Sequence, residues 1–139
     1  MKAIEINQPG SLTTNKAPET NFTGDVYISD YFECTAPSRL VSATVIFTPG
    51  ARTPWKLNPL GQTLIVTSGI GWAQCEGEEI LEIRAGDIVR FPAGHRHWDG
   101  ATPNHAMTYI AIHEAENGRP VEFGERVTDE EYHKGPGRS

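Results

Sequence analysis

The sequence predicts an all-β domain in which short antiparallel strands form a closed or double-sheet barrel. Fourteen glycines and ten prolines interrupt short runs rich in Val, Ile, Thr, Phe, Trp and Tyr, which is the pattern of strands joined by turns. Helix signals are nearly absent, and the candidate strands begin about ten residues apart. A chain of 139 residues has the length of a single domain. We therefore expect one barrel with one site.

Eight strands are expected, each a run of apolar or β-branched residues bounded by Gly, Pro or polar turn residues. Their ranges are 25–28, 40–47, 62–68, 71–76, 79–83, 88–91, 97–100 and 107–113. Thr128 and Glu131 have the spacing of a capping box, which predicts a short helical turn near the C-terminus.

The chain is expected to have three parts. Residues 1–24 are polar and rich in Thr, Asn and Pro, and they are predicted to be an arm that packs on the barrel or on a partner subunit. Residues 25–133 form the barrel with its C-terminal segment. Residues 134–139 are predicted to be a frayed tail.

The composition argues against several classes of protein. Lys and Arg total 12 against 18 Asp and Glu, which gives a net charge of −6 without any basic run, so neither nucleic acid nor an anionic membrane surface is an expected partner. Cys34 and Cys75 match no disulfide or zinc-knuckle spacing. No apolar stretch approaches the roughly 18 residues of a membrane span, and the N-terminus lacks the apolar region of a leader. We expect a cytoplasmic protein.

Two stretches place polar side chains at strand spacing. In the first, GARTPWKLNPLGQTLIVTSG, Lys56, Asn58 and Gln62 occupy even-numbered positions. Side chains two apart on a strand point the same way, so these three could share one face. The second stretch, GDIVRFPAGHRH, reads as a strand, a Pro/Gly turn and a new strand that begins with His97. His97 could complete a cluster with the first three.

These spacings resemble the two sequence motifs of the cupins. The first motif, G-x5-H-x-H-x3/4-E-x6-G, has its counterparts at Gly50, Lys56, Asn58, Gln62 and Gly69. The second, G-x5-P-x-G-x2-H-x3-N, has its counterparts at Gly86, Pro92, Gly94 and His97, with Ala101 in place of Asn. The stretches PLGQTLIVT, GWAQ and VTDE further resemble the bacterial carboxymuconolactone-decarboxylase-associated cupins, a subgroup that includes the cupin hydroxynitrile lyases. The resemblance covers residues 40–113 and implies a double-stranded β-helix, the jelly-roll barrel.

The resemblance also implies a metal site, from which this chain departs. Members of the subgroup hold manganese, iron or a similar divalent ion through three His and one Gln, at the positions of Lys56, Asn58, Gln62 and His97. A lysine amine with its ordinary pKa of about 10.4 is protonated at neutral pH and repels a cation. The remaining Asn, Gln and His are a weak, neutral set. We expect no cofactor, with a divalent ion (Mn, Fe, Ni or Zn) on Asn58, Gln62 and His97 as the alternative.

Lys56 therefore has three interpretations. An ammonium in the place of the metal ion could stabilise an enolate or an alkoxide. An amine made neutral by desolvation could act as a base or form a Schiff base with a carbonyl. In the third interpretation the side chain reaches solvent and the site is inactive.

Further candidates lie on neighbouring strands. Tyr109 and His113 share one face of the last long strand and could supply an acid and a base, or could be ordinary core residues. Asp99 follows His97 by two, so it could pair with Lys56, orient His97 or belong to a turn.

Three residues near the motifs are candidates for the mouth or the wall of a pocket. Arg52 and Thr53 precede the first motif strand and could reach the barrel mouth or face solvent. Trp72 could contact a substrate, although large aromatic residues more often belong to a core or a subunit interface.

The resemblance implies an enzyme that acts on a small molecule by lyase, decarboxylase or isomerase chemistry through a carbanion-like intermediate. Lys56, His97, Tyr109 and His113 would be its catalytic residues. One alternative is a non-catalytic cupin that binds a small ligand. Another is a metal-dependent lyase or oxygenase, of which the oxygenase ranks lower because oxygen chemistry needs the metal. Sheet edges and the N-terminal arm suit pairing of two copies, so we expect a homodimer.

Overall fold

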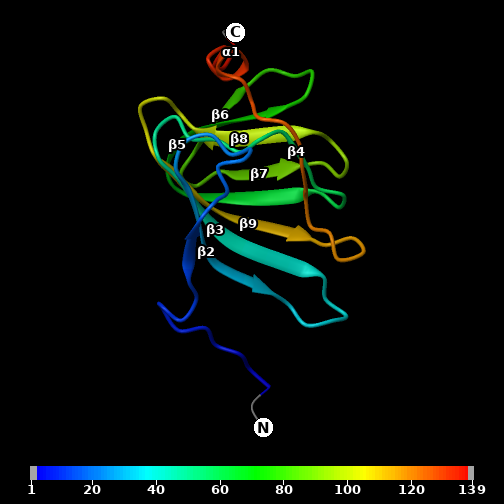
Figure 1. The fold of residues 1–139 in the computed structure, drawn as a ribbon. Coiled ribbons are helices and arrows are strands. Elements are labelled where there is room, and N and C mark those ends of the chain that lie inside the picture. The colour runs from blue at the N-terminus through cyan, green and yellow to red at the C-terminus, as the bar shows by residue number, and fades with distance from the viewer. Residues whose placement is uncertain (1–2, 138–139) are drawn as a thin grey trace.

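A computed structural model describes residues 3–137, and it shows an antiparallel sheet that curls into a half-barrel (Figure 1). In this range the strands are β1 (Thr14–Lys16), β2 (Val26–Glu33), β3 (Leu40–Phe47), β4 (Lys56–Leu57), β5 (Gln62–Cys75), β6 (Leu81–Arg84), β7 (Ile88–Phe91), β8 (His97–Ala101), β9 (Met107–Glu114) and β10 (Glu122–Phe123), and the helix is α1 (Asp129–Tyr132). The predicted all-β class is confirmed.

The strand order along the sheet is β1-β2-β3-β9-β5-β8-β4-β10, with β6 and β7 paired to β5. Strand β5 joins the two halves of the barrel. Its first half pairs with β7 and β9, and its second half pairs with β6 and β8. The motif residues of β5, β8 and β4 thus face the same interior.

One correction concerns β5, which is a single strand of 14 residues where two strands were expected. The predicted break fell at residues 69–70, where Gly69 does have a φ of 80°. However, the pairing with β9 continues past a register shift between Val66 and Ser68, so the glycine allows a bend without ending the strand. A Cβ at Gly69 would lie 1.9 Å from the carbonyl oxygen of Ala106. The absent side chain is therefore what permits this close approach.

The C-terminal segment caps one end of the barrel (Figure 1). The predicted capping box is confirmed, because the Thr128 side chain accepts from the backbone N–H of Glu131 and the Glu131 carboxylate accepts from the N–H of Thr128. Tyr132 is buried, in a cluster with Trp55, Ile80, Trp98 and Val127.

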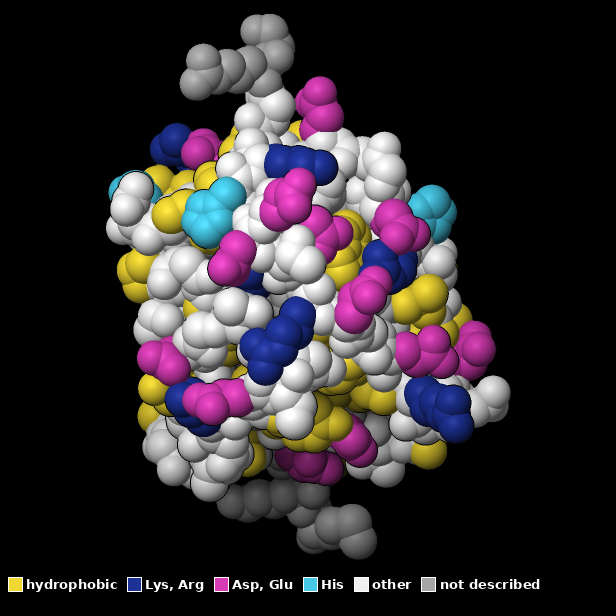
Figure 2. Space-filling model, turned by 45° about the horizontal axis from the view of Figure 1, so that its top comes forward, with side chains coloured by type: hydrophobic (Ala, Val, Ile, Leu, Met, Phe, Trp, Pro, Cys, Tyr) yellow, Lys and Arg dark blue, Asp and Glu magenta, His cyan; other side chains and the backbone are white. Residues whose placement is uncertain are grey.

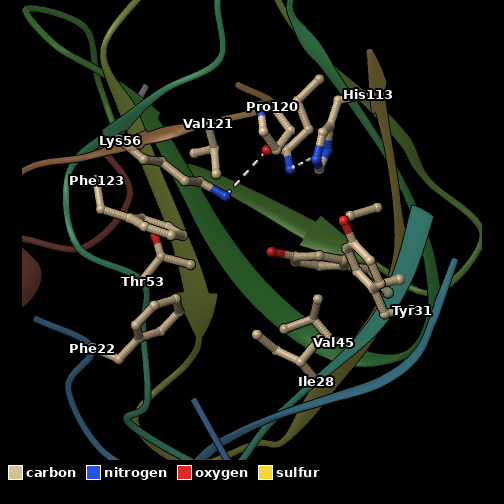
Figure 3. A pocket seen from close by; sticks show the side chains of 14 residues that line it. Phe22, Ile28, Tyr31, Val45, Thr53, Lys56, His113, Pro120, Val121 and Phe123 are labelled. Atoms are coloured by element: carbon tan, nitrogen blue, oxygen red, sulfur yellow. Dashed lines mark hydrogen bonds between the residues drawn. The ribbon is translucent and has the colours of Figure 1, made fainter. Parts of the chain in front are cut away.

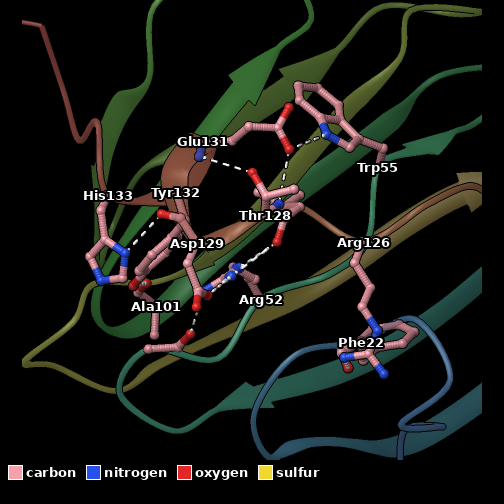
Figure 4. A network of polar contacts seen from close by, with 12 residues as sticks. Phe22, Arg52, Trp55, Ala101, Arg126, Thr128, Asp129, Glu131, Tyr132 and His133 are labelled. Carbon is pink, nitrogen blue, oxygen red and sulfur yellow. Dashed lines mark hydrogen bonds and ion pairs between the residues drawn. The ribbon is translucent and has the colours of Figure 1, made fainter.

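Arg52 holds α1 on the barrel (Figure 4). Its Nη2 donates to the carbonyl of Val127 at 2.9 Å and to Asp129 Oδ1 at 2.7 Å, and its guanidinium lies 4.3 Å from the ring centroid of Tyr132. The side chain is buried, so Arg52 neither faces solvent nor reaches the barrel mouth. The two acceptors in the C-terminal segment, the carbonyl of Val127 and the carboxylate of Asp129, hold the guanidinium in this position.

The N-terminal arm packs partly on the barrel. Strand β1 pairs with β2, and Ala17 and Phe22 are buried in the main core. At the other end, Pro136 forms an isolated bridge with Ile80, so this part of the tail is attached to the barrel where fraying was expected. Residues 138–139 lie outside the described residues.

The surface carries charges of both signs. On the face shown in Figure 2, Lys and Arg side chains alternate with Asp and Glu. Within residues 3–137, no helix has the length and apolar character that crossing a membrane requires.

Candidate active site

A cavity of about 220 Å³ opens inside the half-barrel, between β2, β3, β5, β9 and the segment around β10 (Figure 3). Most of its wall is apolar. It is lined by Phe22, Ile28, Tyr31, Ala43, Val45, Thr53, Lys56, Gln62, Tyr109, Ala111, His113, Pro120, Val121 and Phe123. Lys56 is the charged side chain among these lining residues, so the polar end of the cavity is built around it.

Lys56 is held in the interior by the short strand β4, which pairs with β8 at His97 and with β10 at Phe123. Its side chain is 4% exposed, so the interpretation in which it reaches solvent is wrong. The Nζ atom lies 2.7 Å from Oδ2 of Asp99 and donates to Oε1 of Gln62 at 3.1 Å. An ammonium has three donor hydrogens; one is donated to Gln62, and another side of the group faces Asp99 as an ion pair.

Asp99 is completely buried on β8, where its side chain and backbone make several polar contacts. Besides the ion pair with Lys56, its Oδ1 accepts from the Tyr109 hydroxyl at 2.6 Å, and its backbone N–H donates to the Thr53 hydroxyl at 3.2 Å. Burial and the adjacent carboxylate raise the pKa of Tyr109 well above its ordinary value. Tyr109 is therefore a phenol that donates to Asp99. Of the predicted roles of Asp99, pairing with Lys56 is the one that the geometry supports.

His97 is buried and lies on the ring of Phe91, with the centroids 3.9 Å apart. Its Nδ1 faces the carbonyl of His95 at 2.8 Å and its Nε2 faces Gln62 Oε1 at 3.3 Å. Burial and the charge of Lys56 lower its pKa to about 4, so the ring is neutral at pH 7 and has one N–H. The shorter contact, to the carbonyl of His95, favours a proton on Nδ1. The Nε2 atom then has a lone pair, which faces the side of Gln62. His97 does not line the cavity.

Gln62 lies between Lys56 and the two histidines. Because its Oε1 accepts from Lys56, its Nε2 points to Nδ1 of His113, 3.4 Å away. Burial and the Lys56 charge lower the pKa of His113 to about 4, so this ring too is neutral at pH 7. His113 lines the cavity and contacts Gln62 only weakly, which leaves it able to contact a bound molecule.

Asn58 does not join the cluster in the way that strand parity predicted. Strand β4 ends at Leu57, so the alternation stops before Asn58. Its Nδ2 donates to the carbonyl of Pro120 at 2.9 Å, and its Oδ1 has no hydrogen-bond partner among the described residues. Asn58 is fully buried but does not line the cavity, so the structure separates it from a bound substrate.

The residues present do not fit the divalent ion that the family pattern implies. Gln62 Oε1, a counterpart of a metal ligand, accepts from the Lys56 ammonium. Within residues 3–137, no three His, Cys, Asp or Glu side chains converge on one point. A cation at this place would meet a fixed positive charge and one imidazole, which is a poor set of ligands for Mn, Fe, Ni or Zn.

Two other predicted residues are found in different settings. Thr53 lines the cavity and also supports Asp99. Trp72 lies outside the cavity, in the cluster beneath α1, with its ring centroid 5.0 Å from that of Tyr132. The structure thus places Trp72 away from any bound substrate and gives it a packing role.

Sequence reasoning missed the aromatic wall of the cavity. Phe22 from the N-terminal arm and Phe123 from β10 meet edge to face, with centroids 5.3 Å apart, and Tyr31 lies across from them in Figure 3. Phe22 and Phe123 come from segments with no strand signal, and no local pattern indicated that both fold over the barrel opening.

A family model described as a cupin domain matches residues 43–113. The chain belongs to the cupin family. It is 49% identical over 131 residues to a protein of Granulicella tundricola named (R)-mandelonitrile lyase, which covers 94% of this chain and all of the relative. The predicted family is confirmed.

Solved structures agree with this assignment. A cupin-like protein from Thermotoga maritima is 33% identical, with a TM-score of 0.81 over 98% of this chain and 100% of that chain. The polyketide cyclase RemF from Streptomyces resistomycificus is similar in fold, with a TM-score of 0.72, 14% identity, and coverage of 94% of this chain and 91% of that chain. Both structures thus agree with the cupin fold.

Proposed function

We propose that this cupin is a lyase that breaks or forms a carbon–carbon bond beside the oxygen of a small, uncharged organic molecule, with the Lys56 ammonium in the place of a metal ion. The observation that carries the proposal is the position of Lys56, which is buried at the polar end of an apolar cavity and fixed by Asp99 and Gln62. The full-length relationship to a protein named (R)-mandelonitrile lyase supports the reaction class.

The charge of the site supports an uncharged substrate. The Lys56 ammonium is compensated by the Asp99 carboxylate at 2.7 Å, and the low pKa values of His97 and His113 keep both rings neutral. A substrate carboxylate would lose its water inside apolar walls without gaining a free cation, which is costly. A carbonyl or hydroxyl group needs only one donor.

Lys56 would supply that donor. The third hydrogen of its ammonium has no acceptor among the described contacts, and Lys56 lines the cavity, so a substrate oxygen can accept from it. As the carbon–carbon bond forms or breaks beside that oxygen, negative charge develops there and is stabilised by the fixed ammonium. Such preorganised donors in a water-poor site typically contribute about 100- to 1,000-fold in rate.

His113 is the proposed proton carrier because it lines the cavity as a neutral imidazole. The charge of Lys56 contributes to its low pKa. As His113 takes the hydroxyl proton, negative charge develops on the substrate oxygen beside Lys56 and offsets the ammonium, which makes the imidazole a stronger base. His113 would then pass the proton to the departing carbanion. Tyr109 positions Asp99 and remains protonated.

A second candidate is a non-catalytic protein that binds a small ligand. The observation that favours it is that Lys56, Asp99 and Gln62 already satisfy one another. Such a protein would bind the same uncharged molecules in the cavity but would show no turnover.

The test is cleavage of racemic mandelonitrile, followed by the absorbance of released benzaldehyde, with wild type, Lys56→Met and Lys134→Met. Lys134 is exposed, so its variant is the matched control. We expect turnover by wild type and the control, and a loss of about 100-fold or more in Lys56→Met. Full activity in Lys56→Met contradicts the role of Lys56. Binding of benzaldehyde without turnover of any cyanohydrin favours the second candidate.

A further inference from the structure

We propose that Lys56 also forms a covalent imine with aldehydes that enter the cavity, so that this cupin has an amine-catalysed activity besides the electrostatic one. The inference rests on the proposed function only in that a carbonyl group binds beside Nζ. The surroundings of Lys56 are the observation that supports the inference.

Lys56 differs from the other described lysines in its surroundings. Its side chain is 4% exposed, whereas Lys16 is 42% exposed and Lys134 is also exposed. Around Lys56 the cavity wall is formed by apolar groups such as Val121 and Phe123. A nucleophilic amine must first give up a proton, so the site needs a proton acceptor beside Nζ.

Asp99 is placed to take the proton that Lys56 must lose. Its Oδ2 forms an ion pair with Nζ at 2.7 Å and has no hydrogen-bond partner among the described residues. The carboxylate is fully buried, so it faces Nζ inside the protein. Tyr109 and the Thr53 hydroxyl fix Asp99, which keeps the acceptor in contact with the amine.

The reaction balances without any further reagent. Asp99 takes one proton from the Lys56 ammonium, and the Nζ lone pair attacks the aldehyde carbon. A C–N bond forms, and the carbonyl oxygen takes the proton from Asp99 to give a hydroxyl group. Asp99 then accepts a second proton from the nitrogen and delivers it to that hydroxyl group, which leaves as water while the C=N bond forms. The products are a protonated imine, one water molecule and the Asp99 carboxylate.

The protonated imine suits this site because its charge is that of the ammonium it replaces. It keeps one N–H for Asp99 and gives up the bond to Gln62 Oε1, so the buried carboxylate stays paired. A protonated imine withdraws electrons from the neighbouring carbon, and His113 lines the same cavity. The chemical class of substrate is therefore an uncharged aldehyde with a hydrogen or a cleavable bond on the carbon next to the carbonyl, and the activity is bond cleavage or proton exchange at that carbon. Benzaldehyde, whose ring carbon carries neither, would stop at the imine and so serves as a trapping probe.

The test is reductive trapping of the folded wild-type chain with benzaldehyde and sodium cyanoborohydride, read by intact mass and by peptide mapping. We expect one benzyl group per chain, on Lys56, before Lys16 and Lys134 react. Lys56→Arg keeps the charge without a nucleophilic amine and should lose this early label, whereas Lys134→Arg should keep it. In urea, where the cavity is lost, all lysines should react alike.

Early labelling of Lys16 or Lys134 with Lys56 unmodified would overturn the inference, and this result needs no variant to fold. Mandelonitrile cleavage, measured on the same preparation, separates the two proposals. A chain that cleaves mandelonitrile without labelling at Lys56 refutes the imine and leaves the lyase. A chain that is labelled at Lys56 without cleaving cyanohydrins refutes the proposed lyase and supports the imine.

Discussion

The Nζ atom of Lys56 lies 2.7 Å from Oδ2 of Asp99, and these side chains are 4% and 0% exposed. A buried charge without its partner strongly destabilises a fold, so each of these two charges depends on the other. Lys56 stands at the position of a metal-binding histidine in the family pattern, so the pair puts a fixed cation and its counter-ion where that pattern implies a metal ion.

Removing one member of the pair should destabilise the fold more than removing both. Lys56→Met leaves the Asp99 carboxylate buried without its cation, and breaking a buried pair in this way typically costs about 3–5 kcal/mol. The double variant Lys56→Met/Asp99→Asn should recover most of that free energy of unfolding. Urea unfolding followed by tryptophan fluorescence measures all three chains. Equal stability of the single and double variants would show that the pair is not coupled.

Asp99→Asn should give the cavity affinity for carboxylates. The variant leaves the Lys56 ammonium without its counter-ion, and a ligand carboxylate can then take the place of Asp99. We expect benzoate binding, measured by titration calorimetry, to tighten by about tenfold, the equivalent of roughly 1.4 kcal/mol. Benzyl alcohol, which has the ring without the charge, is the matched ligand and should change little. Tight binding of benzoate by wild type would contradict the argument for an uncharged substrate.

The stability of the protein should fall with pH between about 6.5 and 4. The pKa values of His97 and His113 are about 4 in the folded chain and about 6.5 in an unfolded one. In this window the unfolded state binds more protons, so the stabilisation is complete above pH 6.5 and is lost as the pH falls toward 4. His97, the more deeply buried, contributes on the order of 3 kcal/mol.

The check on this pH dependence is urea unfolding at several pH values with His97→Gln and, as the control, His133→Gln. His97→Gln should flatten the dependence. His133 is exposed, so its variant should follow wild type. An equally steep dependence in His97→Gln would show that this ring is not the group that titrates.

Replacing the two altered positions with histidine should create metal affinity. In Lys56→His/Asn58→His, the repelling ammonium is gone, and Gln62 Oε1 and His97 Nε2 are free to bind an ion. We expect about one Mn, Fe, Ni or Zn ion per chain by elemental analysis after metal loading. Lys56→His alone, which lacks the second imidazole, should bind more weakly. Stoichiometric metal on wild type after the same treatment would mean that the Lys56 charge does not exclude the ion.

The fold was predictable from sequence because its signals are local. Glycine and proline spacing marked the turns, and Thr128 with Glu131 marked the helix. Strand parity correctly grouped His97 with Asp99 and Tyr109 with His113, since β8 and β9 are regular strands. It failed for Asn58 because β4 is only two residues long.

The cavity wall was less predictable because it depends on contacts between distant segments. Phe22 and Phe123 meet across about a hundred positions of the chain, and no local pattern records such a contact. Trp72 lies on β5, but its ring packs on Tyr132 of α1, a partner that only the folded chain reveals. The homodimer and the cytoplasmic location stay predictions.

The most direct test of the central claim, that Lys56 takes the place of the metal ion, is mandelonitrile cleavage by wild-type protein after treatment with a chelator, with the metal content of the same sample measured. The account predicts an unchanged rate in a sample that contains far less than one metal ion per chain. A rate that disappears with the chelator and returns when Mn²⁺ or Fe²⁺ is added would contradict it.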